Sequence, residues 1–280
     1  MKVNIITDSA SDISLAQAKE LNITILPLQI SFGEENYYDG VDLSHEAFYK
    51  KLIETDVFPK TSQITPYEYK KVFSELEEKG EEAVCITLSE KLSGCYQSAA
   101  LAASDMDKIH VVDSQNVSLG QRILVELAIR LRDQGLSAAE IAKELEEKKK
   151  KIKLVALLDT LEYLKKGGRI SPTVAFAGAV LSIKPVIAIV DGEVVLLGKA
   201  RGSKNGNNKL IEMIQSEGGI SFDMPYCLAY TGLNRDILNK YIEDSRFLYE
   251  GKIEELPVSS IGAAVGTHIG PGAIAAAFFV

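Results

Sequence analysis

The sequence predicts an α/β protein: an N-terminal, mostly parallel sheet with helices on both faces in residues 1–152, and an α+β domain in residues 153–280. Three observations lead to this prediction. Short apolar runs alternate with helical patterns through the first half, which is typical of a parallel sheet covered on both faces. Two helix starts in that half carry complete capping signals. The second half mixes a strong hairpin signal with helices, which favours an α+β arrangement.

Apolar runs and helical patterns place the elements of the first half. We expect strands at residues 3–7, 83–88 and 109–113, a further extended run at 23–30, and a polar segment with turn residues at 31–38. We expect helices near residues 15–21, after Ser93-Gly94, and near residues 119–134.

The two capped helices have the same start signal. Thr65 stands at the cap, Pro66 in the first turn and Glu68 three residues after the cap. Ser137 and Glu140 repeat the pattern. We expect the first helix to end at Gly80. The second should run to the lysines at 148–151, which we interpret as a solvated helix end favoured by the helix dipole.

A change of pattern follows residue 153. Two apolar runs at 186–190 and 194–197 flank Asp191-Gly192, which is a strong hairpin signal. We then expect helices near 209–217 and 235–243, and strands at 226–230, around 247–256, and at 273–280.

Composition excludes several classes of protein. The 280 residues carry a net charge of −8, which disfavours non-specific binding to nucleic acid, so we expect no nucleic-acid partner. Three scattered cysteines with no CxxC pair support neither a zinc cluster nor a disulfide framework. We expect no metal, and a reducing, cytoplasmic location. The apolar stretches at 173–190 and 259–280 are interrupted by charge, glycine and proline, so we expect at most a transient membrane contact and no membrane span.

Small hydroxyl residues cluster where the expected strands end. Thr7-Asp8-Ser9, Thr87-Leu88-Ser89 and Asp113-Ser114 follow three strands, Ser93-Gly94 opens a helix, and residues 60–63 precede the capped one. Ligands of open parallel sheets bind beyond the carboxyl ends of the strands, where hydroxyls and helix N–H groups can hold a carboxylate or phosphate. The alternative is that these residues only cap helices and turns.

Nucleotide and hydrolase motifs are absent from the sequence. There is no Gly-x-Gly-x-x-Gly after the first strand, no P-loop and no Gly-x-Ser-x-Gly elbow. With three histidines, a His-rich metal site or a Ser-His-Asp triad is hard to assemble. The site is better equipped to hold a ligand than to cleave one.

Two further features could take part in a site. Residues 266–272 surround His268 with three glycines and a proline, which indicates an irregular backbone and an imidazole free to donate to an anion. Basic residues gather at 165–169 and 199–204, and they could meet a phosphate or an acidic partner surface. The alternatives are a buried structural histidine and solvated turns.

These segments together resemble the DegV family of bacterial fatty-acid-binding proteins, in order from residue 7 to the C-terminus. The matching stretches are Thr7-Asp8-Ser9-Ala10-Ser11-Asp12-Ile13, Lys60-Thr61-Ser62-Gln63 with Thr65-Pro66, Leu92-Ser93-Gly94 with Tyr96-Gln97-Ser98-Ala99, Val111-Val112-Asp113-Ser114, residues 161–171, Lys184-Pro185, and His268-Ile269-Gly270-Pro271-Gly272. The sequence departs from the family pattern at Cys95, Ile64 and Gln121-Arg122.

The resemblance implies two α/β domains with a long-chain fatty acid buried between them. It also implies a non-catalytic, acyl-carrying subunit that presents the carboxylate to a separate kinase subunit carrying ATP, so that the acyl-phosphate feeds phospholipid synthesis. By resemblance, Arg169 and Arg201 lie at the mouth and meet the kinase or the acyl-phosphate. The carboxylate would be bound by Thr61, Ser62, Ser93, Gly94 and His268.

Two alternatives stay open. The protein could carry or sense fatty acid without any kinase partner. It could also be an enzyme that acts on a small anionic metabolite through Asp8, Asp113 and His268.

Overall fold

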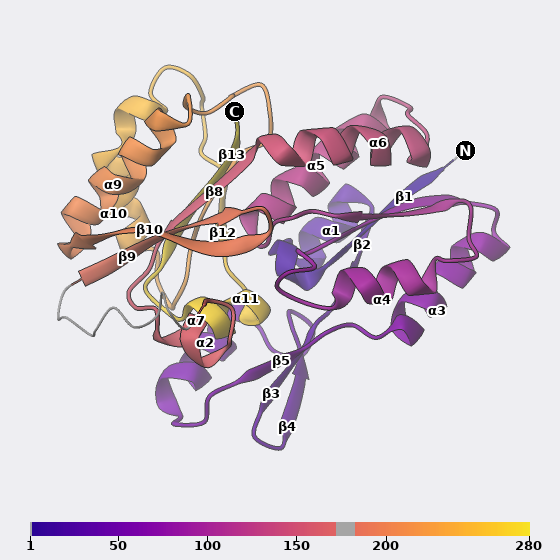
Figure 1. Cartoon of the computed structure of the whole chain (residues 1–280), viewed down its shortest axis with the longest axis horizontal. Coiled ribbons are helices and arrows are strands. Elements are labelled where there is room, and N and C mark those ends of the chain that lie inside the picture. The colour runs from indigo at the N-terminus through magenta and orange to yellow at the C-terminus, as the bar shows by residue number, and fades with distance from the viewer. Residues whose placement is uncertain (1, 172–182) are drawn as a thin grey trace.

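The computed structural model describes residues 2–171 and 183–280, and the chain is drawn in Figure 1. A four-stranded parallel sheet and a six-stranded mixed sheet lie side by side, with a small three-stranded sheet next to their junction (Figure 1). Within the described ranges, no helix is long and apolar enough to cross a bilayer. Of the apolar stretch at 173–190, the part from residue 183 is described, and it is a strand.

The parallel sheet has the order β2-β1-β6-β7. Its strands are β1 (Val3–Asp8), β2 (Ile23–Leu26), β6 (Glu82–Thr87) and β7 (Ile109–Asp113). Helices α5 (Leu119–Asp133) and α6 (Ala138–Lys148) cover one face, and α3 (Pro66–Glu78) and α4 (Cys95–Ala102) cover the other, as the sequence predicted (Figure 1). The short α1 (Leu15–Leu21) packs beside β2.

Both predicted capping boxes are confirmed. The Thr65 hydroxyl accepts the Glu68 N–H, and the Glu68 carboxylate accepts the Thr65 N–H at 2.7 Å. Ser137 and Glu140 make the same reciprocal pair at the start of α6. The lysines after α6 are not all solvated: Lys149 is buried and donates to the Asp113 carbonyl oxygen at 2.8 Å, so this part of the prediction is wrong.

The six-stranded sheet has the order β10-β9-β8-β13-β11-β12 and is antiparallel except for the β11–β12 pair. Its strands are β8 (Ile152–Leu157), β9 (Ile183–Val190), β10 (Glu193–Arg201), β11 (Cys227–Tyr230), β12 (Val258–Ser260) and β13 (Ile274–Phe279). Helix α9 (Gly202–Ser216) packs on β8, β9 and β10, and α10 (Asp236–Asp244) packs on β11. The predicted hairpin is confirmed: Asp191 and Gly192 both have positive φ, as its two-residue turn requires.

The third sheet was not expected. Residues 23–30 do not form one extended run but two strands, β2 and β3 (Gln29–Phe32), which belong to different sheets. Pro27 lies between them and has no backbone N–H to donate. The segment expected to be a polar excursion is a hairpin of β3 with β4 (Glu35–Tyr38), turning at Gly33 with φ +63. Strand β5 (Lys60–Ser62) pairs with the other edge of β3, and α2 (His45–Glu54) packs its Phe48 ring on Phe32.

Two expectations near the C-terminus are also wrong. Residues 247–256 form no strand: the chain makes a short 3₁₀ helix, Arg246–Leu248, whose Leu248 packs with Tyr241 of α10. Residues 266–269 are not irregular, because they belong to helix α11 (Ala263–Ile269). The irregular backbone begins at Gly270, where φ is +71.

One hydrophobic core connects the two large sheets. It includes Ile5 of β1, Ile86 of β6, Ile123 of α5, Leu154 of β8 and Phe279 of β13. A second cluster fills the space between the far face of the six-stranded sheet and helices α9 and α10. Strand β8 begins at Ile152, and the division of the chain into residues 1–152 and 153–280 stays a prediction.

The second cluster should carry a large share of the stability. Phe278 of β13 is fully buried in it, so Phe278→Ala leaves a cavity and should lower the free energy of unfolding by about 3–5 kcal/mol. Urea denaturation followed by circular dichroism measures the change. As a control, Leu101→Ala on α4, where the side chain is 65% exposed, should stay within about 0.5 kcal/mol of the parent. Equal effects of the two variants would contradict this account of the core.

Candidate functional site

An apolar cavity lies where the carboxyl ends of the parallel strands face the six-stranded sheet. Its lining includes Ala10 after β1, Leu88 after β6 and Val117 after β7, together with residues of β8, β9 and β13. The cavity has about 760 Å³ of empty volume, part of it open to solvent. The crevice therefore lies at the edge of the sheet where the sequence predicted it.

The far wall of the cavity follows from strand alternation. Along β8, Leu154 and Ala156 face the cavity, while the intervening Val155 belongs to the cluster behind the sheet. Ala156 pairs with Ile187 of β9 and with Ala275 of β13, so these three form one row across the wall. A second row, about 6.6 Å further along the strands, holds Leu154, Ile189 and Val194.

Three polar side chains of the lining, Thr61, Arg169 and His268, lie close together, and we call this part the polar end of the cavity. Of the 21 described residues in its lining, 16 are aliphatic, and the polar ones are Thr61, Ser93, Ser118, Arg169 and His268. Strand β5 places Thr61, helix α11 places His268, and the loop after α7 (Glu162–Lys166) places Arg169. Thr61 Oγ1 lies 3.0 Å from His268 Nε2. The guanidinium of Arg169 donates to the Leu92 carbonyl oxygen at 3.1 Å, next to Ser93.

His268 is neutral at this position. Burial and the nearby Arg169 charge lower its pKa to about 4. Its Nδ1 is buried and has no partner among the described residues, and a buried lone pair is better tolerated there than a buried N–H. We therefore assign the imidazole hydrogen to Nε2, which donates to Thr61 Oγ1. The Thr61 hydroxyl hydrogen is then free to donate into the cavity.

Two glycines allow this packing around His268. A Cβ on Gly167, at the end of α7, would lie 2.1 Å from His268 Nδ1. A Cβ on Gly270 would lie 2.3 Å from the ring of Tyr163, and its φ of +71 also favours glycine. Helices α7 and α11 therefore approach closely at the end of the cavity, and the imidazole is fixed between them.

The other three predicted site residues, Ser62, Gly94 and Arg201, are not among the described residues of the lining. Ser62 is exposed, because it follows Thr61 along β5 and takes the opposite side of the strand. Gly94 is half-buried beneath the Gln63 amide, which a Cβ on Gly94 would approach to 2.0 Å. Arg201 is exposed at the end of β10, opposite Ile183 of β9. The structure thus brings Thr61, Ser93, Arg169 and His268 together, and the roles predicted for all seven residues stay predictions.

Asp8 and Asp113, the two carboxylates of the enzyme alternative, accept hydrogen bonds from backbone N–H groups of the chain. Asp8 accepts the N–H groups of Leu88 at 2.8 Å and Ala10 at 3.1 Å. Asp113 accepts the N–H of Gln115 at 2.9 Å. Burial raises the pKa of both, to about 6 in Asp8. Neither is among the described residues of the lining, and both act as acceptors that hold strand ends together.

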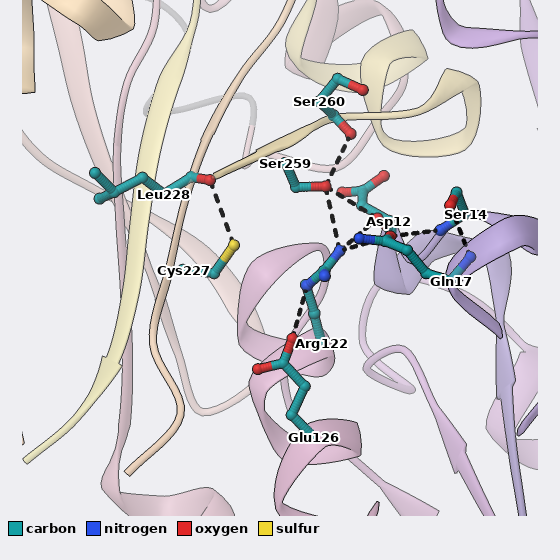
Figure 2. Close-up of polar contacts among 9 residues, drawn as sticks. All are labelled: Asp12, Ser14, Gln17, Arg122, Glu126, Cys227, Leu228, Ser259 and Ser260. Atoms are coloured by element: carbon teal, nitrogen blue, oxygen red, sulfur yellow. Dashed lines mark hydrogen bonds and ion pairs between the residues drawn. The ribbon is translucent and has the colours of Figure 1, made fainter. Parts of the chain in front are cut away.

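Sequence reasoning missed Ser118 and the polar network behind it. Ser118 lines the cavity, and its hydroxyl donates to the buried Asp12 carboxylate. Figure 2 shows that Arg122 donates through Nη1 to the Asp12 carbonyl oxygen at 3.0 Å and to Ser259 Oγ at 3.3 Å. The available signal was a hydroxyl between a strand end and a helix start, the pattern already noted at Ser93. Its positive φ of 54 could not be predicted.

The arrangement is suited to an amphipathic anion. Hydroxyl hydrogens and a guanidinium can satisfy a carboxylate at one end, while the aliphatic rows accept an apolar chain. Among the described residues, no group of three or more His, Cys, Asp or Glu side chains could hold a metal ion. The chain's own residues thus offer binding and orientation.

Comparisons with known proteins show the family of this chain. The model of the DegV family matches residues 2–280. A DegV domain-containing protein of Caldanaerobacter subterraneus is 35% identical over 280 residues, covering 99% of this chain and 98% of the relative.

Solved structures of similar proteins have the same fold. The structure described as the fatty acid binding of a DegV family protein from Thermus thermophilus has a TM-score of 0.88 and 30% identity, and covers 100% of both chains. A stearic acid-binding protein from Eubacterium ventriosum has a TM-score of 0.86 and 28% identity, and covers 98% of this chain and 97% of the neighbour. The chain belongs to the DegV family.

Proposed function

We propose that the protein binds one long-chain fatty acid, with the tail along the aliphatic rows and the carboxylate at Thr61, Ser93 and Arg169. The observation that carries this proposal is an apolar cavity in whose lining Thr61, Arg169 and His268 lie close together. Each buried methylene contributes about 0.8 kcal/mol, so a long acyl chain gains on the order of 10 kcal/mol before the losses of association. The fatty acids carried by the Thermus and Eubacterium neighbours support the same ligand class.

Mass spectrometry of the native protein, followed by denaturation and identification of what is released, tests the ligand class. We expect a stoichiometric fatty acid of long chain. Protein that is empty as purified and takes up no added oleate or palmitate would contradict the proposal.

The hydroxyls of Thr61 and Ser93 should determine affinity for the head group. Thr61→Val and Ser93→Ala each remove a donor to a charged carboxylate, which is worth about 1.5–3 kcal/mol, so oleate affinity should fall about 10- to 100-fold. Displacement of a fluorescent fatty acid measures the change. The matched control is Ser62→Ala. Ser62 is exposed beside Thr61 and is not among the described lining residues, so this variant should change oleate affinity little. A larger loss in Ser62→Ala than in Ser93→Ala would move the carboxylate to the other side of β5.

Neutral His268 should give stability a defined pH dependence. Its pKa of about 4 lies below the ordinary value of 6.5, so the unfolded chain binds more protons between these pH values. The stability that His268 contributes is therefore complete above pH 6.5 and is lost as the pH falls toward 4. Relative to His268→Gln, the parent should lose stability over that window, as urea denaturation at several pH values measures. A difference between the two proteins that does not vary with pH would contradict the lowered pKa.

We further propose that the bound carboxylate is presented to a separate kinase subunit carrying ATP. The γ-phosphoryl group would pass to a carboxylate oxygen, giving acyl-phosphate and ADP. The sequence resemblance supports this role, together with Arg169 at the polar end of the cavity and Arg201 exposed on β10. Positive charge near the reacting oxygens stabilises phosphoryl transfer.

Arg201 provides the cleaner test of partner binding, because it lies outside the described lining. Arg201→Glu should reduce acyl-phosphate formation at least tenfold in a mixture of oleate, ATP, Mg²⁺ and a fatty acid kinase subunit, while oleate affinity stays within about twofold. Lys71→Glu, a charge reversal on the exposed side of α3, is the matched control and should keep full activity. Full activity of Arg201→Glu would remove this residue from the interface, and a carrier without a kinase partner would be favoured if no subunit supported the reaction.

A further inference from the structure

Helix α11 has no capping side chain of its own. A helix leaves its first four N–H groups without partners inside the helix, and α11 begins after Gly262, which has no side chain to offer. Two acids from far along the chain take over this task. Asp12 Oδ1 accepts the Gly262 N–H at 2.7 Å, while Asp39 Oδ1 and Oδ2 accept the N–H groups of Ala263 at 2.9 Å and Ala264 at 3.2 Å.

Gly262 leaves the space that these acids need. A Cβ at this position would lie 3.2 Å from Asp12 Oδ1, 3.2 Å from Asp39 Oδ1 and 2.7 Å from His45 Nε2. A serine or threonine cap would have no room there. The start of α11 is therefore held by residues of the N-terminal half, more than 200 positions earlier in the chain.

The other end of α11 carries the imidazole of the cavity. His268 stands six residues after Gly262, which corresponds to about 9 Å along a helix. The body of the helix has little freedom to roll, because a Cβ on Gly266 would lie 2.7 Å from both the Phe48 ring and the Tyr49 hydroxyl. Tyr49 in turn donates to the Ile261 carbonyl oxygen at 3.0 Å. A shift at the start of α11 is therefore transmitted to His268.

Asp12 also connects this helix start to the cavity wall. Its second carboxylate oxygen accepts the hydroxyl of Ser118, which lines the cavity. Its backbone carbonyl oxygen accepts Arg122 Nη1 and Ser259 Oγ, the contacts drawn in Figure 2. Asp12 and Ser118 both have φ near +55, a conformation that residues with a side chain seldom adopt unless their surroundings hold them there.

We propose that Asp12 and Asp39 are positioning residues of the carboxylate site: they fix the start of α11 and thereby the contact between His268 and Thr61. The proposal rests on the proposed function, since it concerns the same site, but its primary readout is the imidazole of His268 in ligand-free protein. Burial raises the pKa of both acids, so an asparagine in either place removes a desolvation cost and the variants are expected to fold.

The substitution is chosen to disturb the bonds selectively. In Asp39→Asn, one side-chain oxygen remains for one N–H of α11, and the amide NH₂ faces the other N–H, donor to donor. In Asp12→Asn, the oxygen can serve either Gly262 or Ser118, not both. Each variant thus weakens the hold on α11 without adding volume.

The experiment is imidazole NMR on the full-length, ¹⁵N-labelled chain without ligand, titrated from pH 4 to 8. The chain has three histidines, so each ring can be followed separately. In Asp39→Asn and Asp12→Asn we expect the His268 pKa to move from about 4 toward the ordinary value and the Nε2–H signal to lose its protection, because the ring leaves its buried place. His110, at the start of β7 and away from the cavity end of that strand, is the internal control and should not move.

Asp113→Asn is the matched control variant. It neutralises another buried acid that accepts backbone N–H groups, but none of those groups belongs to α11. We expect the His268 signals of this variant to equal those of the parent. Oleate affinity should fall about tenfold in the two α11 variants and stay unchanged in Asp113→Asn.

Two results would overturn the positioning role. One is unchanged His268 signals in a folded Asp39→Asn or Asp12→Asn protein. The other is an equal His268 shift in Asp113→Asn, which would point to general loosening. If Asp39→Asn does not fold, the His268 signals of Asp12→Asn alone test the positioning role. If His268 moves as expected but the parent binds no fatty acid, the positioning role stands and the proposed function fails.

Discussion

The carboxyl-end edge of the parallel sheet is buried against a face of a second sheet, and the rest of the structure depends on this constraint. Such an edge carries turns, helix starts and hydroxyls, and each polar group left without a partner there would destabilise the fold. In this protein, buried side chains form hydrogen bonds with these backbone groups. Asp8 accepts the N–H of Leu88, Asp39 accepts two N–H groups of α11, and Lys149 donates to the carbonyl oxygen of Asp113. The cavity lies at this edge, between the ends of the parallel strands and the six-stranded sheet.

The walls and the polar end of the cavity come from different parts of the chain. The aliphatic rows belong to β8, β9, β10 and β13, whereas Thr61 and Ser93 belong to the N-terminal half and His268 to the C-terminal half. A ligand that touches all of them contacts the six-stranded sheet and residues of the N-terminal half at once. Because such a ligand binds only the folded chain, it stabilises the contact between the sheets by mass action. Binding and the integrity of the sheet junction are therefore linked.

Local signals predicted most of the fold, and long-range contacts account for what was missed. Thr65 and Ser137 predicted the starts of their helices, because a capping box involves residues only three positions apart. Asp191-Gly192 likewise predicted the hairpin, because a two-residue turn depends on adjacent residues. The small third sheet was missed because only its pairing with β5, about 30 residues later, turns a polar segment into strands. In the site, Thr61, Ser93, Arg169 and His268 were named in advance from their sequence patterns, and the family resemblance supplied the roles expected of them. Asp12 and Asp39 were not assigned to the site, because their partners at 262–264 are distant in sequence and a glycine cap gives no signal.

The aliphatic rows, rather than the charge at the polar end of the cavity, would distinguish a fatty acid from a small inorganic anion. His268 enters neutral, so the positive charge there comes from Arg169, whose guanidinium is bonded in the ligand-free chain to the carbonyl oxygens of Leu92 and Gly167. A carboxylate that reaches this end gains charge-assisted hydrogen bonds, which are stronger than the neutral ones it meets. A free phosphate would meet the same donors but would leave the aliphatic rows empty and would lose the energy of burying a chain. Under the proposed function, the head group fixes the orientation of the ligand while the tail supplies affinity, so an anion without an apolar chain is a poor ligand for this site.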